Sequence, residues 1–280
     1  MLTCNQKNYV IIFNYNLPGK TTAIYEKLLL DGFEDTQIMV VDNGSDRAEI
    51  ARSTNFLLPF NIRFTGQAYM ALTFIMEFCE FDNLVMITTS AGLKDELNYM
   101  ECLNRVLDDH SYKFGYITAS LSGGDSETNA HEQMTTNLEH EYKQIYKYQP
   151  IFTVISKELI TKCRESKSSY FNLDLKRGWG IDRELQYIAN IHGLPCYVSK
   201  SLSVNWDTNL THRKGMADES REKYHLEASI EMESVFSKKY GLNWNDIFIR
   251  AFDERHSGES ITKALVKKFL YSSGIIRLIR

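Results

Sequence analysis

Two acidic residues follow a tryptophan that is flanked by glycines, in the stretch Gly178-Trp179-Gly180-Ile181-Asp182-Arg183-Glu184. A tryptophan beside flexible backbone offers a flat apolar face on which a sugar ring can lie. A neighbouring carboxylate can take the proton of a hydroxyl group, as a general base does. Acidic residues are also common in the first turn of a helix, so a plain helix start is the alternative interpretation.

A second group of polar residues follows two short apolar segments near the N-terminus. Residues 9–13 lead into Asn14 and Tyr15, and residues 37–41 lead into Asp42-Asn43-Gly44-Ser45. An exposed carboxylate at the end of a strand can accept a hydrogen bond from a nucleotide base. The same four residues are also typical of a turn with no ligand, and the sequence leaves both interpretations open.

Residues 14–21, between the two apolar segments of this second group, come close to a phosphate-binding loop. Gly19, Lys20 and Thr21 match the end of the pattern G-x-x-x-x-G-K-[ST], but Asn14 stands where the first glycine belongs. That glycine lets the backbone wrap around the phosphates, so its replacement argues against the motif. A P-loop nucleotidase remains an alternative.

The elements that must position these residues alternate along the chain. Apolar segments rich in β-branched residues alternate with segments whose apolar residues recur at helical spacing. Strands are predicted at 9–13, 37–41, 61–64, 84–87, 114–119, 151–155 and 196–198, and helices at 20–30, 46–55, 68–79, 94–108, 157–164, 182–192 and from 215 onward. This pattern predicts an α/β sheet with mostly parallel strands, in which ligands bind at the carboxyl ends of the strands.

The composition is that of an ordinary globular protein. The chain has 280 residues, of which 43% are hydrophobic and 24% charged, and a net charge of −4, so nucleic-acid binding would need a local basic patch. The five cysteines are scattered, which indicates free thiols in a reducing compartment. We find no signal sequence and no run of about 18 apolar residues that could span a membrane. We therefore expect a soluble, cytoplasmic protein, at most peripheral to a membrane surface.

The two motifs occur in an order, over roughly residues 9–212, that resembles the family 2 glycosyltransferases of the GT-A fold. The resemblance implies a Rossmann-like α/β domain over residues 1–214 and a helical C-terminal annex over residues 215–280. It also implies that Tyr15 flanks the uracil of a UDP-sugar and that Asp42 accepts from the ring N–H. The nucleotide-binding residues predicted in this way are Asn14, Tyr15, Asp42, Asn43, Thr89 and Ser90.

The Gly-Trp-Gly stretch resembles the acceptor-site motif of GT-A enzymes, which is also found in galactosyltransferases. The resemblance implies that Trp179 and Gly180 bind the acceptor. It further implies that Asp182 is the catalytic base, with Glu184 as its substitute, and that the anomeric carbon is inverted.

The sequence departs from the family at the end of the fourth strand. GT-A enzymes usually have Asp-x-Asp there, which holds Mn²⁺ or Mg²⁺, whereas residues 88–92 read Thr-Thr-Ser-Ala-Gly and the next carboxylate is Asp95. We favour a metal-independent enzyme in which cations bind the departing diphosphate. The candidates are Lys176, Arg177, His212, Arg213 and Lys214. A metal held by Asp95, Asp207 or His212, and a fold that has kept only binding, are the alternatives.

The last 21 residues, 260–280, combine lysines and arginines with apolar residues at helical spacing. A basic amphipathic tail suggests contact with a membrane surface, which would suit a lipid-linked acceptor. A terminal helix packed on the domain and a contact with nucleic-acid phosphates are the other interpretations.

We therefore expect an inverting hexosyl- or pentosyltransferase of polysaccharide biosynthesis. It would move a sugar from a UDP-sugar to a hydroxyl group of a glycan or of a lipid-linked saccharide. The alternatives are a phage-type enzyme that glycosylates hydroxymethylated DNA bases and a non-catalytic module that binds nucleotide sugars or glycans.

Overall fold

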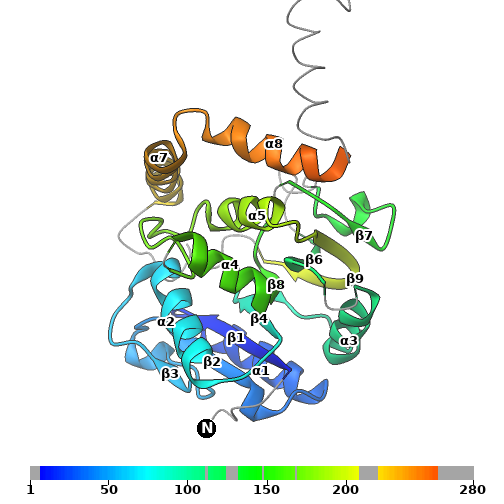
Figure 1. The fold of residues 1–280 in the computed structure, drawn as a ribbon. Coiled ribbons are helices and arrows are strands. Elements are labelled where there is room, and N and C mark those ends of the chain that lie inside the picture. Colours follow the sequence, from blue (N-terminus) through cyan, green and yellow to red (C-terminus); the bar gives the residue numbers. More distant parts are fainter. Residues whose placement is uncertain are drawn as a thin grey trace, which may run out of the picture.

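The computed structural model describes residues 7–110, 113–123, 132–146, 148–167, 169–207 and 220–257 (Figure 1). The strands are β1 (Asn8–Asn14), β2 (Ile38–Asp42), β3 (Phe56–Leu57), β4 (Asn83–Thr88), β5 (Ala91–Gly92), β6 (Tyr116–Ser122), β7 (Tyr142–Lys143), β8 (Phe152–Ser156) and β9 (Cys196–Trp206). The helices are α1 (Pro18–Leu30), α2 (Arg63–Phe78), α3 (Tyr99–Asp109), α4 (Lys157–Lys167), α5 (Ile181–Ile191), α7 (Arg221–Tyr240) and α8 (Trp244–Ser257).

The nine described strands form one sheet in the order β3-β2-β1-β4-β8-β6-β9-β5, with β7 paired to β9. Strands β1, β2, β3, β4, β6 and β9 run in one direction, and β5, β7 and β8 run in the other. The predicted α/β class with a mostly parallel sheet is therefore confirmed.

The chain reverses its direction of winding at β1, which lies between β2 and β4 and is parallel to both. Asn14 pairs with Asp42, and Phe13 pairs with Thr88, so the three strands end at nearly the same level. Ligands of open α/β sheets bind at such a reversal, outside the carboxyl ends of the strands. The first two predicted strands thus bring Asn14 and Asp42 to this edge.

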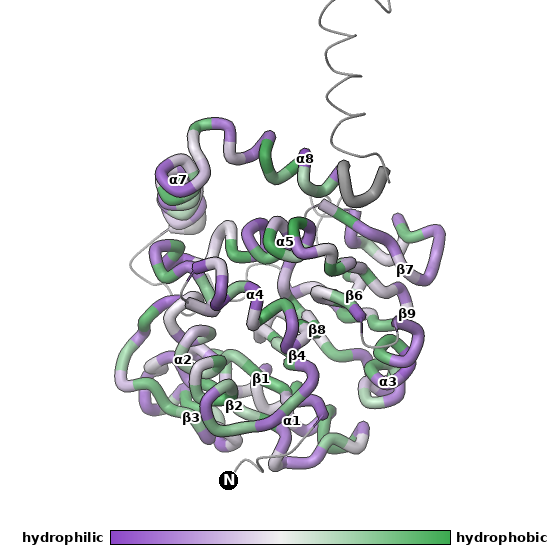
Figure 2. The backbone as a smooth tube through the Cα atoms, viewed as in Figure 1, coloured by the Kyte–Doolittle hydropathy of each residue, from purple (hydrophilic) through white to green (hydrophobic). Residues whose placement is uncertain are grey.

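Both faces of the sheet are covered, which explains why β1 is an unbroken apolar run. Because successive side chains of a strand point to opposite faces, Tyr9 and Ile11 join one hydrophobic cluster while Val10 and Ile12 join the other. The first cluster takes in α2, α4 and α5, and the second takes in α1 and α3. Hydrophobic residues are concentrated on the strands and on the helix turns that face them (Figure 2).

The two C-terminal helices lie beyond α5, on the side away from the sheet (Figure 1). Phe236 of α7 and Trp244 and Phe248 of α8 are buried in the same cluster as Tyr9 and Ile11 of β1. The helical prediction after residue 215 is confirmed for these two segments. The domain boundary at residue 214 stays a prediction, although the two parts share a core. No helix in the described part of the chain has the length and apolar character needed to cross a bilayer.

Two predicted elements between β2 and α2 are wrong. The expected helix at 46–55 is reduced to one 3₁₀ turn, η2 (Arg47–Glu49). The expected strand at 61–64 is instead the end of a loop followed by the first two residues of α2. Tertiary hydrogen bonds override the local pattern here: Asn55 Oδ1 accepts from Val40 N and its Nδ2 donates to the Ile38 carbonyl, each at 2.8 Å. An asparagine side chain thus holds the segment against β2, where β3 then pairs.

Candidate active site

A buried polar network closes the ends of β1 and β2. Asn14 Nδ2 donates to Asp42 Oδ2 at 2.6 Å, and the backbone N–H of Ser45 donates to Asp42 Oδ1 at 2.8 Å. Asn14 and Asp42 are both fully buried. The predicted bond between Asp42 and a base would therefore require the loop after β2 to move, because the Asp42 side chain has no exposed surface. In this structure the carboxylate fixes the loop after β2 against β1.

The other side of Asn14 holds the start of α1. Its Oδ1 accepts from the Thr21 hydroxyl at 2.8 Å and from the Leu17 N–H at 3.2 Å. The P-loop interpretation gains no support, because the Thr21 hydroxyl is buried and bonded to Asn14 and to the Leu17 carbonyl. Tyr15 follows as a half-buried residue at the same strand end, where a flanking ring could reach a base.

The loop after β2 is fastened to the start of α2. Asn43 Nδ2 donates to Asn61 Oδ1 at 2.9 Å, and Asn43 Oδ1 accepts from the Ile62 N–H at 3.0 Å. Gly44 has a φ of +68°, and a Cβ at this position would lie 2.3 Å from the carbonyl carbon of Phe60. The turn therefore needs glycine for both its conformation and its close approach.

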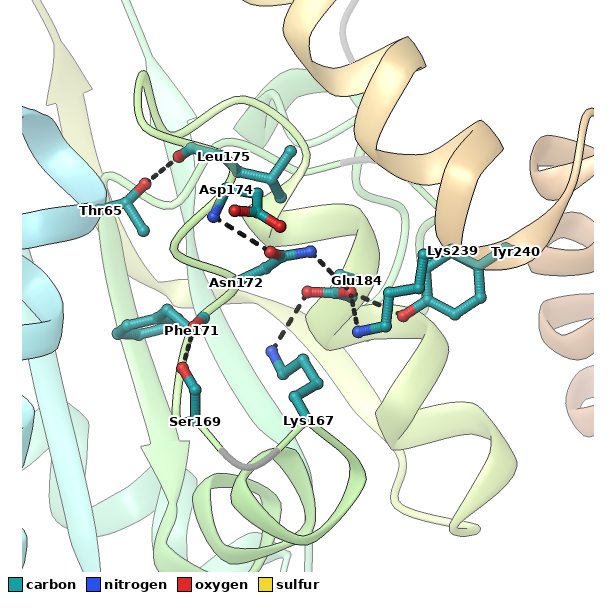
Figure 3. A network of polar contacts seen from close by, with 10 residues as sticks. All are labelled: Thr65, Lys167, Ser169, Phe171, Asn172, Asp174, Leu175, Glu184, Lys239 and Tyr240. Atoms are coloured by element: carbon teal, nitrogen blue, oxygen red, sulfur yellow. Dashed lines mark hydrogen bonds and ion pairs between the residues drawn. The ribbon is translucent and has the colours of Figure 1, made fainter.

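The first turn of α2 in turn contacts the Gly-Trp-Gly stretch. The Thr65 hydroxyl donates to the Leu175 carbonyl (Figure 3). Phe64 packs against Phe13 of β1, with ring centroids 5.4 Å apart, and a Cβ on Gly178 would lie 2.8 Å from Phe64 Cδ1. The two motifs predicted from the sequence are therefore connected through the start of α2.

Asp182 lies in the first turn of α5, directly after this stretch. The residue is half-buried, and burial raises the pKa of its carboxyl group to about 6, although the charge of Arg183 and nearby backbone groups lower it in part. A carboxylate with a pKa near neutrality is suited to accept a proton from a hydroxyl group. Trp179 is partly exposed beside His225 of α7, with centroids 5.1 Å apart, and Gly180 caps α5 with a φ of +90°.

Glu184 lies in a different environment, although it is only two residues further along α5. It is buried and accepts hydrogen bonds from Tyr240 at 2.6 Å, Lys239 at 3.0 Å and Lys167 at 3.2 Å (Figure 3). Burial alone would raise the pKa of its carboxyl group, but the charge of Lys167 and the bonds from Tyr240 and Lys239 hold that pKa below its usual value. This geometry does not favour Glu184 as a substitute base. It joins α4, α5 and α7 as an ionised anchor.

Arg177, predicted to bind the diphosphate, is engaged with α7 instead. Its guanidinium pairs with Glu227 and lies 3.5 Å from Glu231 Oε2, and its backbone N–H donates to Glu231 Oε1 at 3.0 Å. To bind a phosphate, it would have to give up these partners. Of the other four predicted diphosphate ligands, Lys176 is exposed beside Arg177. His212, Arg213 and Lys214 lie outside the described residues, as does the segment 260–280.

The end of β4 presents hydroxyl groups where GT-A enzymes usually have carboxylates. Thr88 and Ser90 are half-buried, Thr89 is buried, and the Ser90 carbonyl accepts from the Asp207 N–H at 3.0 Å. Magnesium and manganese prefer carboxylate oxygens. Within the described ranges, no group of three or more His, Cys, Asp or Glu side chains could hold a metal. The residues at this strand end therefore do not fit a divalent metal site.

Sequence reasoning missed two features of the site. Lys20 of α1 forms an ion pair with Asp207, the residue that is bonded to Ser90. Arg63 begins α2 with a φ of +65°, an uncommon conformation for a residue with a side chain, and uncommon backbone conformations cluster at functional sites. The pattern Gly19-Lys20-Thr21 drew attention to the lysine, but only as part of a P-loop.

Comparison with solved structures identifies the fold. GalNAc-T7 with UDP, GalNAc and Mn²⁺ matches with a TM-score of 0.58 at 11% identity, over 95% of this chain and 54% of that one. S. aureus TarS 1–349 in complex with UDP-GlcNAc matches with a TM-score of 0.53 at 14% identity, over 92% and 74%. The chain thus has the GT-A fold, as the sequence predicted. No family model and no curated protein matches the sequence.

Proposed function

We propose that this protein is an inverting glycosyltransferase that uses a UDP-sugar. It would transfer the sugar to a hydroxyl group of a glycan or of a lipid-linked saccharide, at a cytoplasmic site. The observation that carries the proposal is Asp182, a half-buried carboxylate with a raised pKa, which follows a turn that packs against the start of α2. The GT-A fold supports it, since TarS and GalNAc-T7, which share the fold, were solved with UDP-GlcNAc and with UDP and GalNAc.

The reaction is a single displacement at the anomeric carbon. The acceptor O–H gives its proton to the Asp182 carboxylate while its oxygen forms a bond to the anomeric carbon. The bond from that carbon to the diphosphate oxygen breaks, and its electron pair leaves with UDP. Attack from the side opposite the leaving group inverts the anomeric centre.

The strand ends take the nucleotide part of the donor in this proposal. Tyr15 flanks the base, Thr89 and Ser90 lie at the neighbouring strand end, and Asn43 fixes the loop to α2. Because Asp42 is buried and bonded on both oxygens, we assign it the positioning of that loop through Asn14 and Ser45. Trp179 and Gly180 remain the proposed acceptor contacts.

An Asp182→Asn variant tests the mechanism, because asparagine keeps the shape but cannot take the proton. UDP release would be measured with a panel of UDP-hexoses and UDP-pentoses and oligosaccharide acceptors. We expect turnover to fall by about 10²- to 10⁴-fold, as for the loss of a general base, with UDP affinity unchanged. The matched control is Asp246→Asn, which changes an exposed acid in the first turn of α8. Wild-type turnover by Asp182→Asn would disprove the assigned role.

A non-catalytic binding module is the second candidate. The end of β4 favours this candidate, because Thr88, Thr89 and Ser90 carry hydroxyl groups where GT-A enzymes usually have carboxylates. Such a module would bind UDP-sugars and release no UDP with any acceptor, with or without Mn²⁺. The same panel of substrates, assayed in parallel by calorimetry and by UDP release, separates the two functions.

A further inference from the structure

We propose that Lys20 supplies, at the leaving diphosphate, the positive charge that a divalent metal supplies in many GT-A enzymes. The inference rests on the proposed use of a nucleotide diphosphate sugar. It assigns a binding and catalytic role to a residue that the sequence had marked only as part of an incomplete P-loop pattern.

The first turn of α1 is connected to the ends of β1, where the sheet reverses its winding, and of the neighbouring strand β4. Thr21 bonds to Asn14 at the end of β1 at 2.8 Å. The adjacent residue, Lys20, pairs with Asp207, whose N–H donates to the Ser90 carbonyl just after β4 at 3.0 Å. The ammonium group is thereby held at the end of β4, beside the reversal where ligands bind in such sheets.

The ion pair is accessible to a ligand. The Lys20 and Asp207 side chains are 41% and 38% exposed, and ion pairs this exposed contribute little to stability. The Lys27–Asp31 pair of the same helix is different, because its side chains are only 15% and 6% exposed. A diphosphate carries more charge than a carboxylate, so it can take Lys20 from Asp207 at little cost in folding free energy.

The same arrangement disfavours a metal at this position. The backbone of Asp207 is bonded to Ser90 just after β4, and the charge of its carboxylate is already neutralised by Lys20. Thr88, Thr89 and Ser90 add hydroxyl groups, which bind Mg²⁺ and Mn²⁺ poorly without carboxylates. A fixed ammonium at this place stabilises the negative charge that develops as the bond to the diphosphate breaks.

Calorimetry of UDP and of uridine in EDTA tests the assignment. We expect wild-type protein to bind UDP at least about tenfold more tightly than uridine, as charge-assisted hydrogen bonds to phosphate allow. Lys20→Met should lose this difference and leave uridine binding unchanged, while Lys20→Arg should keep most of it. The control is Lys157→Met, since Lys157 pairs with Glu80 near the opposite end of β4 and is 38% exposed. An unchanged preference for UDP in Lys20→Met would overturn the proposal.

The Asp207→Asn variant distinguishes charge supplied by Lys20 from charge supplied by a bound metal. If Asp207 is only the resting partner of Lys20, the variant binds UDP in EDTA as tightly as wild type or more tightly. If Asp207 holds a metal, wild-type UDP binding rises at least about tenfold with Mn²⁺ and the variant loses that gain, which would overturn the proposal.

The results also distinguish this inference from the proposed function. If UDP binding depends on Lys20 but no acceptor receives a sugar, the role of Lys20 in binding is supported and the proposed glycosyltransferase activity is excluded. If the Lys20→Met variant still transfers the sugar at the wild-type rate, the proposed activity is supported and the role assigned to Lys20 is excluded. If the wild-type protein does not bind UDP, both the proposed function and the role of Lys20 are excluded.

Discussion

Asp182 and Glu184 lie on one helix, and their surroundings move their pKa values in opposite directions. Burial raises the pKa of Asp182 to about 6, whereas the charge of Lys167 and the hydrogen bonds from Tyr240 and Lys239 outweigh burial and lower that of Glu184. Pairs of acids separated in this way commonly divide catalytic and supporting roles. Asp182 is the member that can exchange a proton near neutrality.

The pH dependence of transfer follows from the pKa of Asp182. A base must be deprotonated to act, so kcat/KM should fall about tenfold per pH unit below pH 6 and level off above it. A series of rate measurements from pH 4.5 to 8, with UDP affinity measured in parallel, checks this expectation. A profile that stays flat through pH 6 while UDP binding is retained would rule out Asp182 as the base.

Glu184→Gln should destabilise the protein strongly. Glutamine keeps the shape but leaves Lys167 and Lys239 without their shared counter-charge, and breaking a buried ion pair costs about 3–5 kcal/mol. Urea unfolding at pH 7 measures the change in the free energy of unfolding. Glu165→Gln is the control, because its pair with Lys162 on α4 lies in solvent and its loss should have no measurable effect.

The stabilisation by Glu184 should depend on pH with a definite sign. Since its folded pKa is lowered, its contribution is fully present above the ordinary value of 4.5 and is lost as the pH falls through the lowered pKa. The difference in unfolding free energy between wild type and Glu184→Gln should therefore shrink below pH 4.5. A difference that stays constant down to pH 3 would show that Glu184 is not held ionised.

At the scale of elements, Gly178 and Gly180 set the course of the acceptor turn, since both have a positive φ. Gly180 has a φ of +90°, and a Cβ there would lie 2.8 Å from Met232 Cγ and from Phe236 Cζ. Gly180→Ala should cost about 1–3 kcal/mol, because strain in the backbone adds to overpacking against α7. The control is Gly19→Ala, where the space is open and helix propensity predicts a gain of up to about 1 kcal/mol. Equal thermal stability of the two variants would contradict this account.

The sequence predicted the elements that carry strong periodicity, and it missed those that depend on distant partners. The apolar runs of β1, β2 and β4 and the amphipathic spacing of α2 were predicted, whereas the order of the strands, and with it the reversal at β1, was not. The region between β2 and α2 could not be placed, because the side chains of Asn55 and Asn43 choose their partners through the folded structure. Local propensity contains no information on such bonds.

The sequence also predicted only part of the candidate site, because the rest depends on contacts between distant residues. Motif order predicted that Asp182 and the strand ends share a site, which stays a prediction, and it could not show that Asp42 is buried against Asn14 of the neighbouring strand. Lys20 and Asp207 are 187 positions apart and meet only in the folded chain, at the end of β9, where that strand pairs with β5. No local pattern marks such a pair.

At the scale of the whole molecule, the two proposed halves of the site are connected by packing. The loop after β2 holds the start of α2 through Asn43, α2 holds the acceptor turn through Thr65, and α7 holds that turn through Arg177. Glu184 then ties α5 to α7 through Lys239 and Tyr240. The helices after residue 220 therefore support the proposed acceptor side, and they share the core of the sheet.

A chain shortened to residues 1–214 tests whether the C-terminal helices are a separable annex. The truncation removes Phe236, Trp244 and Phe248, which are buried in the core cluster, and it strips Glu184 of two of its donors. Losing one buried aromatic side chain costs about 3–5 kcal/mol, so losing three rivals the whole stability of a domain, about 5–15 kcal/mol. We expect the fragment to show no cooperative thermal transition and to bind a hydrophobic dye, whereas the milder Phe248→Ala variant should still unfold cooperatively at a lower temperature. A fragment that melts cooperatively within a few degrees of the full chain would establish residues 1–214 as an independent domain.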